Sequence, residues 1–460
     1  MNIRVSLFCV LLLTVCSVSL GQTCSNTAPT NEVICTVPQL FGPGGLTLPN
    51  PRHRAHFTDL ENPNAPGFQA FRPINTSIGE ELATLPLASG GSGVSFTFDR
   101  ALGIVTATEG SLGPILTDRA ETIGKKRVNI GAAYQYFGFD SIDGIDLHHL
   151  PQVVGHVQFT LPNGVRPDFE NDYLTTDNRV KLNLHQVVLF GIIGLSSRVD
   201  FSVAIPFESV HFKVSSDATI VRTVPCELNQ TCSDSSAEFG EYHFFDGSSF
   251  QAAFTSTNKI FTNSNNGAGL GDIVLRGKGV VYKAEKTSVA VGLDLRVPTG
   301  DAENFLGAGA VGVTPFVAAS YRTSVISPHV WLGYQWNGSS VLAGNPSTAT
   351  GGTGDLPHAF IYQGGADIRA SSRVTVVADL LGERVFDANR LKRATFTDVH
   401  GAVSPNLVPF KASYSANAIA TGIKVRTVGY LVLTGNLTTR LDSGGLRADV
   451  VPLFGLSYVF

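Results

Sequence analysis

The sequence is poor in charge and in long apolar runs. Charged residues make up 15% of its 460 residues, against about 25% in ordinary soluble domains. The formal net charge is −4, so nothing in the composition indicates nucleic-acid binding. After the first 21 residues no segment approaches ~20 continuous apolar residues, which excludes a transmembrane helix. Any crossing of a membrane must therefore be made by strands.

Cysteine is scarce, and its spacing excludes the common redox and zinc motifs. There is no C-x-x-C pair. Beyond residue 21 four cysteines remain, an even number that in an exported protein predicts disulfides. Of the three connectivities, local pairing is the simplest: Cys24 with Cys35 and Cys226 with Cys232. Each pair closes a short loop, worth about 2–3 kcal/mol in the chain-entropy model.

Residues 1–21 have the pattern of a cleaved secretory signal. Arg4 precedes an apolar run over 5–15, and Ser19 and Gly21 are the small residues before the expected cut. The run is too short to span a bilayer. We therefore expect an exported protein.

From Val128 onward, apolar and polar residues alternate with a period of two. Val199, Phe201 and Val203 alternate with Asp200 and Ser202, and several other segments repeat this pattern. Such strands suit a wall with one face toward lipid. We expect strands near 126–138, 180–192, 198–214, 269–283, 287–298, 311–322, 328–337, 358–370, 373–385, 410–424, 428–441 and 447–460.

The links between these strands alternate between short and long. The long ones are expected at about 139–179, 215–267, 299–310, 337–357 and 386–409. Short periplasmic turns and long outer loops are typical of bacterial outer-membrane barrels. The fold class is thus all-β: a transmembrane antiparallel β-barrel of about 12 strands in the bacterial outer membrane, with lipid as its surroundings.

The signal pattern and the start of the alternating strands divide the chain into three expected parts. Residues 1–21 are the signal peptide, 22–125 a Gly/Pro-rich plug or periplasmic segment, and 126–460 the barrel. The N-terminal segment shows little periodicity, apart from one candidate hairpin over 94–108. The strand count becomes 14 if this hairpin joins the wall.

The final strand ends in an aromatic pattern. Phe454, Leu456, Tyr458 and Phe460 fall on one face of a strand that closes on an aromatic residue. This resembles the signal that the barrel-assembly machinery reads. We expect these four residues to direct insertion.

Charged and aromatic side chains are expected inside the barrel. Both signs of charge occur on neighbouring strands, so they either pair structurally or form the polar part of a conduit, and no single-sign ladder predicts an ion-selective pore. The candidate lumen residues are Phe137, His185, Arg276, Asp294, Arg296, Phe316, Trp331, Asp367, Arg369, Arg373, Asp379 and Glu383.

The sequence contains little that predicts a catalytic, cofactor or metal site. His185 and Ser202 are expected to face the lumen on adjacent strands, which is suggestive of a barrel hydrolase. No G-x-S-x-G is present, however, and we predict no enzyme. Acidic and histidine residues cluster over 140–149, but their spacing matches neither an EF-hand nor a zinc site. No metal or cofactor is predicted.

Two segments resemble a known family. Residues 119–131, with the Tyr-Gln-Tyr-Phe of 134–137, resemble the first-strand entry of the meta-pathway phenol-degradation family. Residues 269–276 and 295–301 resemble its central pair of strands. The resemblance covers roughly 95–460. That family is similar to the outer-membrane channels for fatty acids and aromatic hydrocarbons, and the resemblance implies a transporter.

The predicted function is passive uptake of small hydrophobic or aromatic compounds across the outer membrane. The alternative is a structural or adhesive surface barrel whose contact face is the long loop over 215–267. A barrel hydrolase is the third class. The residues do not identify the substrate.

Overall fold

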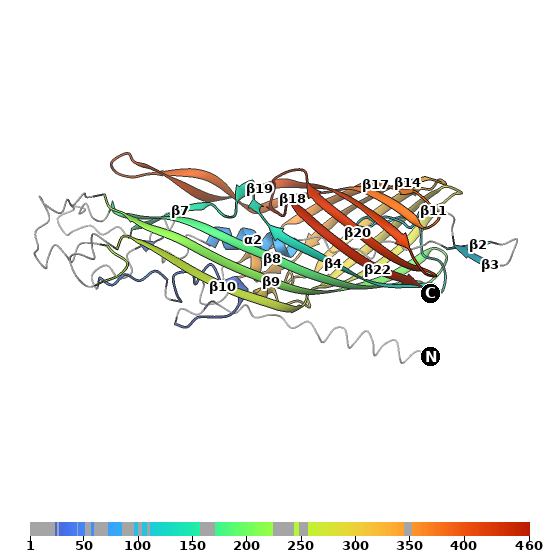
Figure 1. The fold of residues 1–460 in the computed structure, drawn as a ribbon, viewed down its shortest axis with the longest axis horizontal. Helices are drawn as coiled ribbons and strands as arrows, with labels where there is room; N and C mark the ends of the chain where they lie inside the picture. Colours follow the sequence, from blue (N-terminus) through green and yellow to red (C-terminus); the bar gives the residue numbers. More distant parts are fainter. Residues whose placement is uncertain are drawn as a thin grey trace, which may run out of the picture.

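Twelve antiparallel strands close into one barrel (Figure 1). The computed structural model describes residues 24, 27–43, 45–50, 57–58, 72–84, 96–99, 104–107, 111–156, 171–223, 243–247, 256–344 and 352–460. The wall consists, in order, of β4 (Val128–Phe139), β8 (Tyr173–Gly194), β9 (Val199–Val221), β11 (Ile273–Lys283), β12 (Thr287–Val297), β13 (Gly312–Tyr321), β14 (Ile326–Asn337), β17 (His358–Arg369), β18 (Val374–Thr397), β19 (Val403–Arg426), β20 (Leu431–Arg440) and β22 (Val450–Val459).

The last strand of the wall pairs with the first. β22 lies antiparallel to β4, with Phe454 opposite Tyr134 and Tyr458 opposite Ile130. Beyond the ladder, the Phe460 N–H donates to the carbonyl of Val128 at 2.8 Å. The wall therefore has no open edge, as a sheet surrounded by lipid requires. The expected all-β barrel of about 12 strands is confirmed.

The candidate hairpin near 94–108 forms but stays outside the wall. β2 (Phe96–Asp99) and β3 (Ile104–Ala107) pair only with each other, in a separate two-stranded sheet. In Figure 1 this hairpin projects from the end of the barrel where the chain ends. The count of 14 strands is thus wrong.

The outward surface of the wall forms an apolar belt between two aromatic girdles. Tyr282, Tyr321 and Tyr430 are exposed at the end with short turns, while Trp336 and Phe360 are exposed toward the other end. Between them, exposed side chains include Val187, Leu189, Phe201, Val291, Leu293, Val317, Leu332, Val376, Leu380, Ile419, Ile423, Leu433 and Leu456. Outer-membrane barrels carry such a belt, ~25 Å tall, between aromatic girdles. The predicted membrane location is confirmed.

None of the described helices is long and apolar enough to cross a membrane.

Several strands continue far beyond the belt. β8 and β9 have 22 and 23 residues, and β18 and β19 have 24 each. β7 (Leu150–His156) and β10 (Asn258–Leu270) pair with the outer halves of β8 and β9. The expected long links over 139–179, 215–267 and 386–409 are therefore partly strands, because their apolar residues find a core outside the membrane.

That outer core is the largest apolar cluster among the described residues. It joins the outer halves of the strands to the N-terminal segment, with Ile74, Leu174, Phe212 and Leu342 among its buried residues. α2 (Arg72–Thr84), a helix that the sequence reasoning missed, packs on β18 and on η5 (Val341–Ala343). Its apolar residues Ile74, Ile78 and Leu82 recur every four positions, which was the available signal.

Deleting Phe460 should reduce the amount of assembled barrel. The change removes the hydrogen bond to Val128 at the closing seam, a loss of about 1 kcal/mol, together with an outward aromatic ring. Heat-modifiable migration of the membrane fraction on a gel measures the folded share. Tyr282→Ala, which removes a girdle aromatic away from the seam, is the control. Equal folded shares in the two variants would contradict a special role of the seam.

Candidate functional site

A cavity of about 310 Å³ lies inside the barrel. Its lining combines the aromatic residues Phe137, Phe139, Phe190 and Trp331 with charged groups such as Arg276. Pockets for small organic ligands are mostly apolar with a few placed polar groups, at ~300–1,000 Å³. The cavity fits one small organic molecule.

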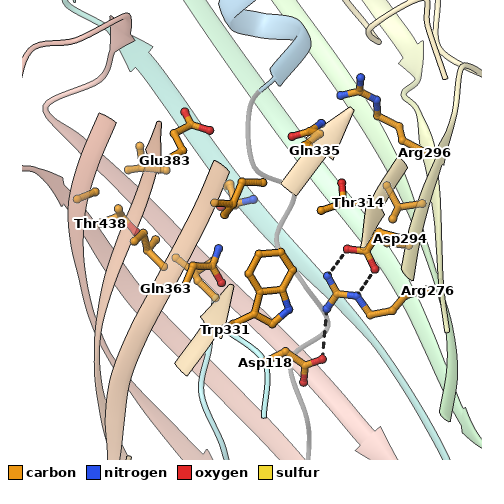
Figure 2. Close-up of a pocket in the computed structure, with 18 of the residues that line it drawn as sticks. Asp118, Arg276, Asp294, Arg296, Thr314, Trp331, Gln335, Gln363, Glu383 and Thr438 are labelled. Carbon is orange, nitrogen blue, oxygen red and sulfur yellow. Dashed lines mark hydrogen bonds and ion pairs between the residues drawn. The ribbon is translucent and has the colours of Figure 1, made fainter. Parts of the chain in front are cut away.

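Two stacked rings form a shelf at the side of the cavity. Phe316 on β13 and Trp331 on β14 lie 5.2 Å apart between ring centroids, with planes 26° apart. The Arg276 guanidinium lies 5.1 Å from the Phe316 centroid. Both rings are buried, and within the described residues the indole N–H of Trp331 has no hydrogen-bond partner. Figure 2 shows the indole beside Asp118 and Arg276. The shelf has a flat apolar face and contains one buried donor without a partner.

The charged residues beside the shelf pair across neighbouring strands. Arg276 on β11 lies directly opposite Asp294 on β12, because the antiparallel register puts their side chains on the same inward face. Its guanidinium donates to both carboxylate oxygens, at 2.7 and 2.6 Å. Arg296, further along β12, donates to the Asn337 side chain at 2.8 Å and lies 3.8 Å from Asp272. Because each arginine lies beside an acidic residue, the inward face of these strands has no continuous row of charges of one sign.

Residues 111–123 cross the lumen near the end with short turns, and we call them the strap. Arg119 of the strap forms an ion pair with Asp367 of β17, which also accepts a hydrogen bond from Ser111. Both Arg119 and Asp367 are buried. Removing one partner of a buried ion pair costs about 3–5 kcal/mol, because the other charge is left buried without a counter-ion. Loss of either residue should therefore loosen the strap.

The opposite wall binds the strap through Asp118. Lys278 on β11 donates to Asp118 at 3.0 Å and to the Arg119 carbonyl at 2.7 Å. Arg276 also reaches Asp118, at 3.3 Å. Together with the pair of Arg119 and Asp367, these bonds tie the strap to both sides of the barrel.

A buried histidine links the strap to two strands. The Nε2 atom of His329 on β14 lies 2.7 Å from the Thr117 hydroxyl and 2.8 Å from Asp379 of β18. Its Nδ1 atom lies 3.4 Å from Asp367. Sequence reasoning missed His329, Lys278 and Lys424, whose ammonium donates to the strap carbonyl of Pro114. Their only signal was polar character at inward positions of apolar strands.

On its outer side the cavity is lined by Leu446, Arg447 and Ala448, and α2 of the N-terminal segment packs on β21 (Leu446–Arg447) beyond them. Asn389 of β18 donates to both carboxylate oxygens of Glu80 on α2, through its backbone N–H at 3.0 Å and through its side chain. Burial raises the pKa of the Glu80 carboxyl, and the hydrogen bonds from Asn389 oppose this shift. Figure 2 shows a helix above the lining residues, on the side away from Asp118.

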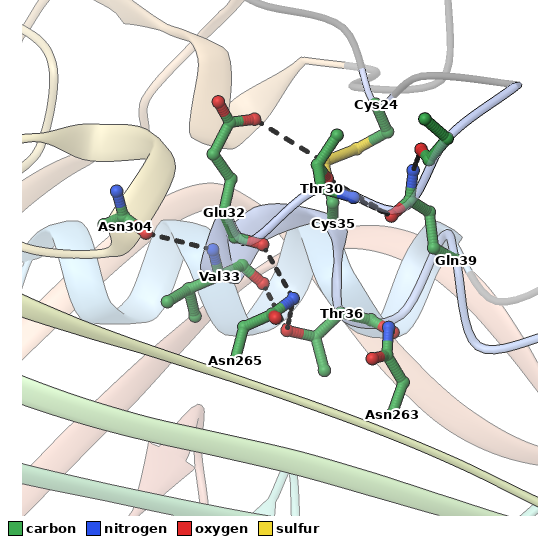
Figure 3. The surroundings of a disulfide bond; sticks show 11 residues. Cys24, Thr30, Glu32, Val33, Cys35, Thr36, Gln39, Asn263, Asn265 and Asn304 are labelled. Carbon is green, nitrogen blue, oxygen red and sulfur yellow. Dashed lines mark hydrogen bonds between the residues drawn. A yellow bond between two sulfur atoms is a disulfide. The ribbon is translucent and has the colours of Figure 1, made fainter. Parts of the chain in front are cut away.

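The Cys24–Cys35 disulfide stabilises a neighbouring part of the N-terminal segment (Figure 3). Cys35 ends η1 (Val33–Cys35), a single turn packed on β10. The Asn265 side chain of β10 donates to the Glu32 carbonyl at 3.0 Å, and Asn304 accepts from the Val33 N–H at 3.2 Å. The expected local pairing is present here. Cys226 and Cys232 lie outside the described residues.

Most of the candidate lumen residues lie on the inward face. Phe137, Arg276, Asp294, Arg296, Trp331 and Glu383 line the cavity. Phe316, Asp367 and Asp379 are buried at the shelf and strap. Arg369 ends β17 at the short-turn rim, and Arg373 is exposed in the following turn, away from the lumen.

The predicted position of His185 is wrong. His185 is exposed on the outward face of β8, where its Nδ1 atom lies 2.9 Å from the Tyr134 hydroxyl and its ring packs on Tyr136. The cause is the outer core: in the outer half of β8 the apolar residues Leu182 and Leu184 turn inward to it. Because Ser202 faces the cavity, the two residues cannot form a hydrolase pair.

The acidic and histidine residues over 140–149 do not converge. Asp143 pairs with Arg390 at 2.6 Å, and His149 lies 3.3 Å from Asp177. Asp146 binds the backbone N–H of His148 at 2.8 Å, which lowers the pKa of its carboxyl. Across the described ranges, no three such side chains gather as a metal site would require.

A family model matches part of the wall. The model described as the putative MetA-pathway of phenol degradation matches residues 201–355. This stretch runs from β9 to the link before β17 and contains the shelf and the Arg276–Asp294 pair. The resemblance noted in the sequence is confirmed over these residues.

Solved outer-membrane channels are similar in outline. A channel from Pseudomonas putida F1 is 12% identical, with 74% of this chain and 98% of that chain covered at a TM-score of 0.41. A Pseudomonas aeruginosa FadL homologue is 8% identical, with 82% of this chain and 99% of that chain covered at a TM-score of 0.31. The toluene transporter TbuX of Ralstonia pickettii is 9% identical, with 77% of this chain and 96% of that chain covered at a TM-score of 0.27. No curated protein matches the chain.

Replacing Arg119 by glutamine should loosen the strap. Asp367 then remains buried without its main cation, which should lower the free energy of unfolding by about 3 kcal/mol. Denaturant titration of the detergent-solubilised protein measures this loss, and single-channel recording should show higher conductance. Arg373→Gln, in an exposed turn, should change neither quantity. An Arg119→Gln protein with unchanged stability and conductance would show that the strap is held by other contacts.

Proposed function

We propose that the protein is an outer-membrane channel for the passive uptake of small hydrophobic or aromatic compounds. The observation that carries the proposal is a cavity of about 310 Å³, lined by four aromatic residues, inside a closed membrane-spanning barrel. The outer leaflet resists apolar solutes, and such an interior shelters them during the crossing. The match of residues 201–355 to the phenol-degradation family model supports the same substrate class.

Within this proposal, residues 22–125 act as a plug. Two of its parts cover the cavity from opposite ends. The strap lies below it, held by ion pairs, and α2 lies on the outer side, held by Glu80 and Asn389. A solute therefore enters only when α2 moves and leaves only when the strap moves. Each cover should open separately, since a lumen open at both ends would conduct ions.

The aromatic shelf binds the solute inside the cavity. An aromatic ring stacks on Trp331 with a gain of about 0.5–1.5 kcal/mol beyond area burial. The free indole N–H then donates to an oxygen on the solute, such as a phenolic hydroxyl. Arg276 and Asp294 satisfy each other and keep the remaining polar wall neutral.

Assembly of the barrel is a separate proposal. Phe454, Leu456, Tyr458 and Phe460 are all exposed on the outward face of β22. This face is accessible to the barrel-assembly machinery before β22 pairs with β4. We assign the recognition of the chain to these four side chains.

Replacing Trp331 by leucine should reduce uptake of labelled phenol by up to about tenfold, because the change removes both the stacking face and the donor. The measurement is saturable uptake into proteoliposomes at equal amounts of folded protein. The protein's other tryptophan, Trp336, is exposed on the same strand. Trp336→Leu is thus a matched control and should retain normal uptake.

A second solute separates the two contributions of Trp331. Uptake of labelled toluene, which lacks the oxygen, should fall less in Trp331→Leu than uptake of phenol does. Equal uptake by both variants would contradict binding at the shelf, and absence of uptake in the wild type would favour the structural barrel.

Linking α2 to β18 should stop uptake. In Glu80→Cys/Asn389→Cys the two thiols replace side chains in hydrogen-bond contact, so a short bismaleimide should join them. Uptake should fall to the level of empty liposomes, because the outer cover is then immobile. Each single-cysteine variant treated with the same reagent is the control and should transport normally. Unimpaired uptake by the linked protein would show that solutes do not pass α2.

A further inference from the structure

Two lysines face each other on the outer surface, above the apolar belt. Lys181 of β8 and Lys213 of β9 are direct cross-strand partners, and both are exposed. Like charges in this position destabilise a sheet. Within the described residues neither ammonium group lies within 4.0 Å of a carboxylate oxygen. The pair therefore presents two uncompensated positive charges to its surroundings.

Polar neighbours surround the pair on the same face. Arg179 lies two positions further out on β8, is exposed and has Ser215 opposite. Ser264 of β10 lies opposite Lys213. Three cations and two hydroxyl groups thus lie on one sheet face, a donor set suited to a phosphate group.

The acidic residues of this face lie further out. Asp177 and Asp217 are opposite each other, four residues beyond the lysine pair on their strands. Asp177 is already within 3.3 Å of His149. Arg179 stands between the two like-charged pairs along β8. The face thus has a cationic level next to the membrane and an acidic level above it.

The depth of the lysine pair matches that of lipid headgroups. Lys181 is four residues outward of His185, whose ring contacts Tyr134 and Tyr136 of β4 and which lies two residues outward of Val187, the last exposed apolar residue of β8. Four strand residues span about 13 Å, which a strand tilt of ~40° reduces to about 10 Å along the membrane normal. The lysines therefore lie just above the level at which the apolar belt ends on these two strands, at Val187 and Phe207.

We propose that Lys181 and Lys213, assisted by Arg179, bind the phosphate group of a phosphorylated glycolipid in the outer leaflet. The phosphate lies between the two ammonium groups and removes their repulsion. The acyl chains then lie against Val187, Leu189 and Phe207 below, which are exposed on the same two strands. The site is separate from the lumen and sets how the long outer extension sits on the membrane.

The test compares binding of a bis-phosphorylated lipid A to full-length folded protein in detergent with binding to Lys181→Gln/Lys213→Gln. Each lysine near an anionic membrane surface contributes roughly fivefold in affinity, so the double variant should bind roughly thirtyfold more weakly. Lys283→Gln/Lys286→Gln, two exposed lysines at the short-turn rim, is the matched control and should bind normally. Lys181→Arg/Lys213→Arg keeps the charge and should retain binding, which also guards against a glutamine variant that fails to fold.

Three results would overturn the proposal. The first is that the glutamine variant binds bis-phosphorylated lipid A as tightly as the wild type. The second is that the wild type binds dephosphorylated lipid A as tightly as the phosphorylated form. The third is that inorganic phosphate alone protects the wild type against thermal unfolding as well as the lipid does. The last result would assign the site to a free anion. In lipid-free detergent the glutamine variant should unfold at the same or a higher temperature than the wild type, because the repulsion is gone. Loss of stability there would indicate an ordinary structural role for the lysines.

Discussion

The pairing of β22 with β4 is the constraint on which the rest of the structure depends. A backbone surrounded by lipid has no water to bond with, so each strand needs a partner on both sides. The register from Leu453 opposite Gln135 to Val459 opposite Asn129 provides the last of these partnerships. Once the wall is closed, the period of two sends every second side chain into a shared interior. The shelf, the ion pairs and the cavity all follow from that enclosure.

The interior is divided by the N-terminal segment into zones of different chemistry. Below the cavity, buried charges bind the strap through opposite charges, a hydroxyl group and backbone groups of the strap, such as the Pro114 carbonyl that accepts from Lys424. Above it, apolar residues of α2 and the strand extensions form a dry core. Ionic contacts at the strap are geometrically specific and costly to break singly, whereas the helix on the outer side is held by apolar packing and the bonds between Glu80 and Asn389. The two covers can thus respond to different events, which suits a conduit that must not open at both ends.

The outward surface divides at the aromatic girdle. Below it, the period of two places apolar residues toward lipid. Above it, the same strands reverse this preference, because the outer core lies inside and water or headgroups lie outside. His185 and the pair of Lys181 and Lys213 belong to this reversed part of β8 and β9. A single long strand therefore turns apolar residues outward in its membrane part and polar residues outward beyond it. The point of change marks the membrane interface.

The alternating residues, turn positions and loop lengths by themselves determined the barrel, its twelve strands and its membrane setting, because these depend on local period and on the chemistry of the solvent. The inward positions of Arg276, Asp294 and Trp331 also followed from that period. Only the tertiary structure decided which charges meet across the lumen, since Arg119 and Asp367 are 248 residues apart in the chain. It likewise decided that α2 forms and that His185 turns outward. Both depend on the outer core, which exists only when distant segments pack together, and no local pattern encodes that contact.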